Sequence, residues 1–245
     1  MIPPSRPQGD CRRPRPEGTS VGTVVGPAEV QALSPPGGAG ERAAALPNVP
    51  HTVAWADVPV QPWRNGGGVT RELLAWPAGD EWQVRVSVAD IDRSGPFSAF
   101  PGIARWFAVL EGDGVVLTLP GGEVALQPGS PPCAFDGADA PGCRLVGGST
   151  RDLNLMLRDA GGRLAPVAED ATWLPEAPQC GLFARVAGEV CFDDGKASVA
   201  LPAMSLTWWS VAPTSLRWRS AAGVPSTGRP GWWLAATPQA PEARE

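Results

Sequence analysis

Histidine is almost absent from this sequence. His51 is the only one in 245 residues, tyrosine does not occur, and Lys196 is the only lysine. Mononuclear iron, manganese and zinc centres in small β-barrels need several imidazoles and usually a carboxylate. A single histidine cannot supply such a set, so we expect no metal in this protein, and no other cofactor.

Cysteine pairs and long apolar runs are missing as well. The five cysteines are odd in number and none forms a Cys-x-x-Cys pair, which leaves neither a zinc motif nor an obvious redox pair. No apolar run approaches a membrane span, and Arg12-Arg13 is not followed by the apolar segment of an export signal. We therefore expect a cytoplasmic protein with reduced thiols and no membrane partner.

Basic clusters are also lacking. The net charge is −5 and the arginines form no basic run, which argues against nucleic acid as a partner. The sequence allows a homodimer but does not predict one.

The composition and apolar patterning of the chain change near residue 49. Residues 1–48 hold nine prolines and seven glycines with almost no periodic apolar pattern, so this segment cannot bury enough apolar area to offset its ordering entropy. The sequence predicts a disordered Pro/Gly-rich extension at 1–48, a main barrel at 49–164, a second, smaller barrel-like half at 165–236 and a flexible tail at 237–245.

From residue 49 onward, the sequence predicts many short strands. Valine occupies every second position of 84–88, around Arg85 and Ser87, and leucine alternates in the same way over 153–157. A hairpin is expected around Asp194-Gly195. Turns recur at the spacing typical of a sandwich or barrel and no helical pattern of useful length appears. The predicted fold class is therefore all-β, a β-barrel or jelly roll with two packed halves.

The cupin family offers a direct comparison because its two motifs have fixed spacing. Aligning the last glycine of the first motif with Gly112 places its carboxylate ligand at Arg105, and its histidine slots hold no histidine. The glycines of the second motif fit Gly121 and Gly129, but its histidine slot holds Pro132. The spacing resembles a cupin scaffold without its metal ligands.

Arg105 is the replacement with a chemical consequence. A guanidinium in a barrel mouth favours an anionic ligand, such as a carboxylate, through bidentate hydrogen bonds. Pairing of Arg105 with a local acid such as Glu72 or Asp152 is the structural alternative.

Three longer stretches carry a family resemblance. "PWRNGGGVTREL" (62–73), "GPFSAFPGIARWFAVLEGDG" (95–114) and "RDLNLMLR" (151–158) together resemble the HutD/Ves family, closely over 52–160 and loosely over 161–236. The resemblance implies a metal-free cupin-type bicupin with no established catalytic activity. It also implies a role in bacterial histidine utilisation, where HutD is thought to restrain the pathway by sensing a metabolite, or in an environmental stress response, as for Ves.

The same stretches supply candidate ligand contacts, each with a structural alternative. The glycine-rich turn offers N–H groups as an anion cradle, or is only a tight connection. The aromatic pair near residue 98 forms a pocket wall, or covers a core. Polar strand faces line a pocket, or are solvated. No catalytic residue is assigned. The candidate ligand-binding residues are Asn65, Gly66, Gly67, Thr70, Arg71, Glu72, Arg85, Ser87, Phe97, Ser98, Phe100, Arg105, Asp152, Asn154 and Met156.

Three functions compete at this point. The first is non-enzymatic binding of a small, anionic metabolite by a sensor. The second is a metal-independent isomerase or lyase, which needs a general acid or base such as Glu72, Asp152 or Cys133. The third is an interaction module, which requires the tryptophan pairs at 208–209 and 232–233 to be exposed.

Overall fold

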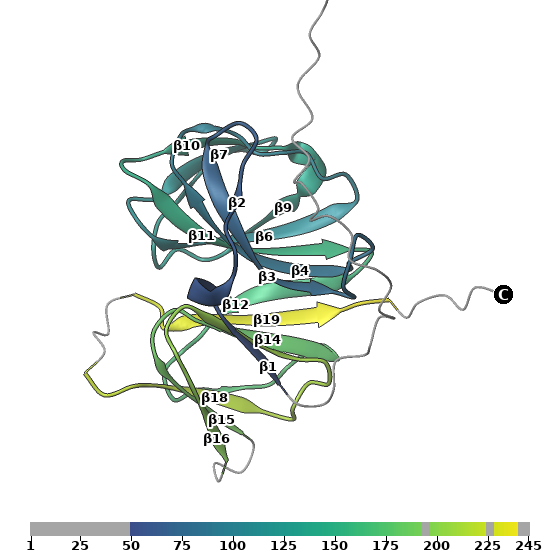
Figure 1. Ribbon diagram of the computed structural model, residues 1–245, viewed down its shortest axis with the longest axis vertical. Helices are drawn as coiled ribbons and strands as arrows, with labels where there is room; N and C mark the ends of the chain where they lie inside the picture. The colour runs from purple at the N-terminus through teal and green to yellow at the C-terminus, as the bar shows by residue number, and fades with distance from the viewer. Residues whose placement is uncertain (1–49, 193–196, 224–227, 240–245) are drawn as a thin grey trace, which may run out of the picture.

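The computed structural model describes residues 50–192, 197–223 and 228–239, which form four antiparallel sheets arranged as two sandwiches (Figure 1). The predicted all-β class with two packed halves is confirmed. The extension expected at 1–48, most of the expected tail and the turn expected at Asp194-Gly195 lie outside the described residues, although the strands on either side of that turn pair with each other.

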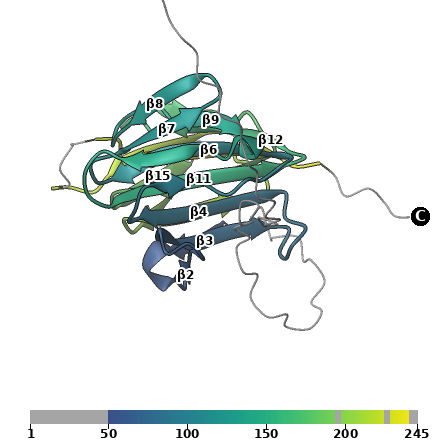
Figure 2. The same cartoon turned by 90° about the horizontal axis from the view of Figure 1, so that it is seen from above.

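The first sandwich packs a six-stranded sheet against a four-stranded sheet. The six-stranded sheet has the order β2-β3-β4-β11-β6-β9 and the four-stranded sheet the order β5-β10-β7-β8. Figure 2 shows β3, β4, β11 and β6 side by side in that order. The bounds are β2 (Gln61–Pro62), β3 (Gly68–Trp76), β4 (Val84–Ile91), β5 (Gly95–Pro96), β6 (Ile103–Glu111), β7 (Val115–Leu119), β8 (Gly122–Leu126), β9 (Cys133–Asp136), β10 (Gly142–Leu145) and β11 (Thr150–Arg158), with the 3₁₀ helix η2 (Gly137–Asp139) after β9.

The second sandwich packs a five-stranded sheet, in the order β1-β17-β14-β19-β12, against a four-stranded sheet in the order β13-β18-β15-β16. Its first strand, β1 (His51–Ala54), precedes the whole first sandwich in the sequence and pairs with β17. The short 3₁₀ helix η1 (Trp55–Asp57) then leads into the first sandwich. The remaining bounds are β12 (Gly161–Pro166), β13 (Thr172–Trp173), β14 (Gln179–Ala184), β15 (Gly188–Phe192), β16 (Ser198–Leu201), β17 (Ser205–Trp209), β18 (Leu216–Ser220) and β19 (Gly231–Thr237).

The two sandwiches meet through their larger sheets, which lie against each other in the middle of the molecule (Figure 1). Apolar residues of both sheets form this junction, which we call the central core. Its members alternate along each strand, as expected for a strand that buries one face. They include Val84, Val86, Val88, Leu153, Leu155 and Leu157 from the first sandwich, and Phe183, Leu206, Trp208, Trp232 and Leu234 from the second.

The interior of each sandwich is different. In the first, an apolar cluster around Phe107, Val115 and Leu117 occupies one part of the space between the sheets. In the second, tryptophans fill the interior, and the rings of Trp173 and Trp233 stack with centroids 4.7 Å apart. The apolar cluster of the first sandwich therefore covers only part of the inner face of its six-stranded sheet, and buried polar residues cover another part.

Within the part of the chain that the structure describes, no helix is long and apolar enough to cross a membrane.

Truncation of the central core tests whether the two sandwiches fold as one unit. Leu155 is fully buried there, so Leu155→Ala should lower the free energy of unfolding by about 2–5 kcal/mol. Val146→Ala, at an exposed position, should change it by less than about 0.5 kcal/mol. Urea unfolding followed by tryptophan fluorescence and by circular dichroism should give one coincident transition for all three proteins. Two separate transitions in Leu155→Ala would contradict a shared core.

Candidate functional site

Polar side chains occupy the centre of the inner face of the six-stranded sheet, the face that points into the first sandwich. Arg85 and Ser87 project from β4, Arg105 from β6, and Asp152 and Asn154 from β11. All five are buried. Their neighbours along each strand point the other way into the central core, so the alternation that builds the fold also places these groups inside.

The strand register sets these side chains in two adjacent rows. Met156 lies between Arg85 and Arg105 on the neighbouring strands, and Asn154 lies between Ser87 and Phe107. Residues directly opposite each other in antiparallel strands have Cα atoms about 4.5–5.5 Å apart. The two arginines therefore flank Met156, whose sulfur accepts a weak contact of 3.8 Å from Arg85 Nη1.

Arg105 is the most enclosed cation of the group, with 6% of its surface exposed. Its Nη2 donates to Asn154 Oδ1 at 2.7 Å, while its Nε finds no acceptor among the described residues. Three aromatic rings surround the guanidinium, with Cζ 5.2 Å from the centroid of Phe97, 5.7 Å from that of Phe100 and 5.0 Å from that of Phe135. Ring faces attract a cation, but they do not replace a hydrogen-bond acceptor.

Burial also sets the protonation of Arg105. It lowers the pKa of the guanidinium to about 10, a shift that the Asp152 carboxyl opposes and the Arg85 charge reinforces. Arg105 is therefore still a cation at neutral pH.

Among the described residues, the hydrogen bonds that connect Asp152 to Arg105 run through Asn154. The Asn154 amide donates from Nδ2 to Asp152 Oδ1 and accepts from Arg105 at its own Oδ1. Burial raises the pKa of Asp152 well above its usual range; the Arg105 charge and the Asn154 hydrogen bond act against this shift, and the Asp90 charge adds to it. Asp152 thus holds its proton to a higher pH than an ordinary aspartate. Because a protonated carboxyl carries no charge, protonated Asp152 does not balance the charge of Arg105.

The second arginine of the group is already paired. Arg85 Nε donates to Glu72 Oε2 at 2.6 Å, and Glu72 is half-buried on β3. Trp82 lies beside this pair, with its ring centroid 6.0 Å from the Arg85 guanidinium carbon. The unmatched positive charge of the inner face is therefore that of Arg105.

The glycine-rich turn does not join this group. Gly66 N donates to Trp63 O at 3.0 Å, and Gly67 N donates to Asn65 Oδ1 at 2.8 Å. A Cβ at Gly68 would lie 2.2 Å from Asp90 O, which explains the glycine at that position. These N–H groups are engaged within the chain, as the tight-connection alternative requires.

Three other candidates lie at the margin or elsewhere. Thr70 Oγ1 accepts from Trp63 Nε1 at 2.8 Å. Arg71 points to the opposite face of β3, where its guanidinium carbon lies 4.1 Å from the centroid of Trp55. Ser98 is half-buried in the segment between β5 and β6. The structure thus brings together Glu72, Arg85, Ser87, Phe97, Phe100, Arg105, Asp152, Asn154 and Met156 from the sequence-derived set.

Phe135 is absent from that set, although its ring is the nearest of the three to Arg105. It lies directly opposite Arg105 in the pairing of β6 with β9. The sequence shows both strands but not their register, so it gives no signal for this contact.

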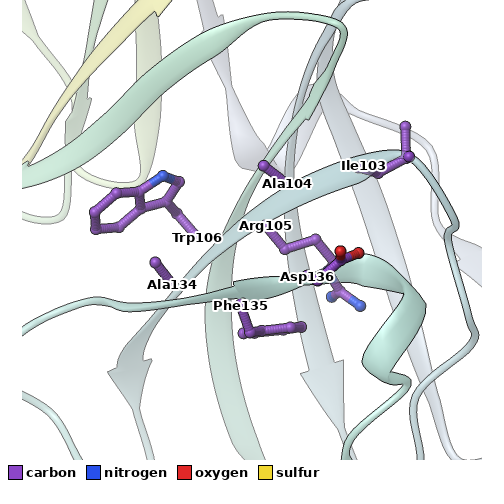
Figure 3. A pocket seen from close by; sticks show the side chains of 8 residues that line it. Ile103, Ala104, Arg105, Trp106, Ala134, Phe135 and Asp136 are labelled. Atoms are coloured by element: carbon purple, nitrogen blue, oxygen red, sulfur yellow. The ribbon is translucent and has the colours of Figure 1, made fainter.

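A hollow of about 530 Å³ opens over the paired strands β6 and β9 (Figure 3). Figure 3 shows the Phe135 ring and the Arg105 guanidinium on one side of the β9 ribbon and the Asp136 carboxylate on the other. Ala104, Ala134 and Asp136 are exposed on this outer side. Arg105 and Phe135 line the hollow as well. We place the candidate site on the inner face because the buried charges are there.

The thiols of the first sandwich are poor nucleophiles. Burial, with a contribution from Asp152, raises the pKa of Cys143 to about 12. Burial likewise raises the pKa of Cys133. Both remain protonated at neutral pH, so neither supplies a thiolate.

Acidic, cysteine and histidine side chains of the described segments form no group of three or more that could hold a metal ion.

Known proteins resemble this chain across both sandwiches. The model of the HutD family matches residues 55–223. A protein of Pseudomonas putida, named as an uncharacterized 21.2 kDa protein in the hutC 3′ region, is 41% identical over 41% of this chain and 54% of its own length. The alignment thus spans about half of that relative. Protein Ves of Citrobacter koseri is 30% identical over 59% of this chain and 83% of its own.

Solved structures give the same result. HutD from Pseudomonas fluorescens SBW25 is 27% identical, with a TM-score of 0.66, over 78% of this chain and all of its own. Ylba from E. coli has a TM-score of 0.54 at 9% identity, over 84% of this chain and 97% of its own, which is a likeness of fold alone. These likenesses confirm the expected cupin-type fold.

Replacing Asp152 by its neutral isostere tests the protonation state of the buried acid. An unfolded aspartate loses its proton near pH 3.8, whereas folded Asp152 retains it to higher pH. The folded state then binds more protons, so the contribution of Asp152 to the free energy of unfolding falls as pH rises above about 4. Asn cannot ionise. Asp152→Asn should therefore gain melting temperature relative to the parent as pH rises above about 4, as measured by thermal unfolding.

Asp136→Asn serves as the control because Asp136 is exposed on the outer side of the same sheet. Its melting temperature should stay at a constant offset from that of the parent over this pH range. An equally constant offset for Asp152→Asn would show that Asp152 titrates like an ordinary aspartate.

Proposed function

Because the chain belongs to the HutD family, we propose that it binds a small carboxylate metabolite inside the first sandwich and acts as a regulatory sensor rather than as an enzyme. Arg105 anchors the carboxylate. The observation that carries this proposal is a buried guanidinium whose Nε has no acceptor among the described residues and whose nearest acid is joined to it only through an amide.

The chemistry of Arg105 favours a carboxylate over a neutral ligand. A guanidinium offers N–H donors in a planar fork that matches the two oxygens of a carboxylate. Asn154 accepts from Nη2, and the buried Nε on the same edge of the group has no acceptor among the described residues. A buried cation without its counter-charge is costly, so an anion that completes its hydrogen bonds binds with a gain that it would not have at the surface.

The surroundings of Arg105 favour a small ligand. Phe97, Phe100 and Phe135 enclose the guanidinium, and they suit the flat or apolar part of an organic acid. Phe97 and Phe100 come from the segment between β5 and β6, which is only half-buried. We place ligand entry at this segment because Phe97 and Phe100 are the more exposed of the three rings around Arg105.

The regulatory role is proposed from the relatives. The P. putida relative is named for its place in the hutC 3′ region, and HutD and Ves are both similar to this chain. These names support a role in histidine utilisation or in the stress response associated with Ves.

A second candidate function has its own observation. Asp152 faces the interior with a raised pKa, which is the property of a general acid in a metal-independent isomerase or lyase. Asp152 is 1% exposed and sits behind Asn154, so it is poorly placed to reach a substrate held at Arg105. Sensing is therefore the better-supported function. Turnover of a bound carboxylate in the parent, lost in Asp152→Asn with binding retained, would reverse this choice.

The tryptophan-rich interaction module has no support. Trp208, Trp209, Trp232 and Trp233 are all buried, so they offer no surface to a partner.

Ligand binding should depend on Arg105. Small carboxylates at millimolar concentration, among them formate, urocanate, formiminoglutamate and histidine, are screened for a rise in melting temperature, because a ligand that binds only the folded state stabilises it. Arg105→Gln should weaken binding of the stabilising acid by about tenfold to a hundredfold, the loss expected for hydrogen bonds to a charged group.

Arg144→Gln is the matched control, since Arg144 is an exposed arginine on β10. It should bind the acid like the parent. If no carboxylate raises the melting temperature, or if Arg105→Gln binds as the parent does, the proposed function is wrong.

A further inference from the structure

We propose that carboxylate binding at Arg105 is coupled to proton uptake at Asp152, so that the first sandwich takes up its anion together with a proton. This inference rests on the proposed function, and it adds how the site is regulated. It makes Asp152 a positioning residue that acts on the ligand through the Arg105 charge.

The coupling begins with the chain Arg105–Asn154–Asp152. Asn154 and Asp152 are two residues apart on β11 and share its inner face, while Arg105 comes from the adjacent strand β6. Asn154 is the only hydrogen-bonded link between the cation and the acid in the described residues. The guanidinium is thus close enough to act on Asp152 electrostatically, and its Nε has no acceptor among the described residues.

A bound carboxylate competes with Asp152 for the charge of Arg105. Without a ligand, Arg105 is the cation that favours the ionised form of Asp152. With a ligand, that charge is offset, and Asp152 also gains a second negative neighbour in a desolvated interior. Both changes favour the protonated acid. Binding of the anion therefore draws a proton onto Asp152, and by linkage a proton on Asp152 strengthens binding of the anion.

The other charged groups around Asp152 do not supply this coupling. On β4, the charge of Asp90 acts on Asp152 in the same direction as the ligand would, and Asp90 is paired with Arg151 at 2.6 Å. On β10, the thiol of Cys143 has its pKa raised to about 12 and is neutral.

The two arginines on the strands beside β11 and the single histidine do not supply the coupling either. Arg105 itself, with a pKa of about 10, stays charged below that pH. Arg85 acts on Arg105 and is paired with Glu72 on β3. His51 is the only histidine, and it is exposed on β1 in the second sandwich.

Formate is the probe for the experiment because it is the smallest carboxylate and is fully ionised above about pH 5. Its dissociation constant from the full chain is measured by calorimetry from about pH 5 to pH 8 in two cationic buffers of different ionisation enthalpy. Cationic buffers bring no competing carboxylate, and the difference in heat between them gives the number of protons taken up.

The parent should take up as much as one proton per formate, and within the coupled range its affinity should fall by about tenfold for each unit of rising pH. Asp152→Asn should take up no proton and should bind formate with a pH-independent affinity. Asp136→Asn, which alters an exposed acid on the outer side of the sheet, should behave like the parent.

The outcomes separate the two proposals. Absence of formate binding, or binding that Arg105→Gln leaves unchanged, overturns the proposed function and the coupling with it. Binding that depends on Arg105 but takes up no proton in the parent overturns the coupling alone. The same holds for proton uptake that persists in Asp152→Asn.

A second measurement covers the case in which Asp152→Asn does not fold. Infrared difference spectra of the parent with isotope-labelled formate should show a new protonated-carboxyl band and the loss of a protein carboxylate band on binding. Spectra without this exchange overturn the coupling.

Discussion

The contact between the two large sheets is the constraint on which the rest of the molecule depends. Valines of β4 and leucines of β11 point across it, against Phe183, Trp208 and Trp232 of the second sandwich. Since side chains alternate along a strand, committing one face to this contact fixes what the other face carries. The polar residues between the valines and leucines therefore point into the interior of the first sandwich, where they are buried from water.

This arrangement makes the two halves chemically unequal. The buried charged residues of the described chain, Arg85, Arg105 and Asp152, all lie in the first sandwich. The second sandwich fills the corresponding space with stacked and packed tryptophans. One half thus carries a buried cation whose Nε has no acceptor among the described residues, and the other is packed with aromatic rings.

The sequence predicted much of this and missed the rest for definable reasons. Alternation in 84–88 and 153–157 indicated the strands and which residues share a face. A β-bulge after Glu72 places both Leu73 and Leu74 in the central core, and no alternating pattern contains it. The contact of Phe135 with Arg105 depends on strand register, which is set by long-range pairing. Likewise, the sequence left open whether Arg105 serves an anionic ligand or pairs with a local acid such as Glu72 or Asp152. Only the fold shows that Glu72 is paired with Arg85.

The position of β1 has a consequence for how the molecule can be divided. This strand belongs to the second sandwich by hydrogen bonding, yet it precedes the entire first sandwich in the chain. A cut in the loop between the halves, which the sequence alone would recommend, would remove β1 from the fragment that contains β17. The exposed edge of β17 would then invite pairing with another chain. The second sandwich is thus assembled from two segments of the chain, one before and one after the first sandwich.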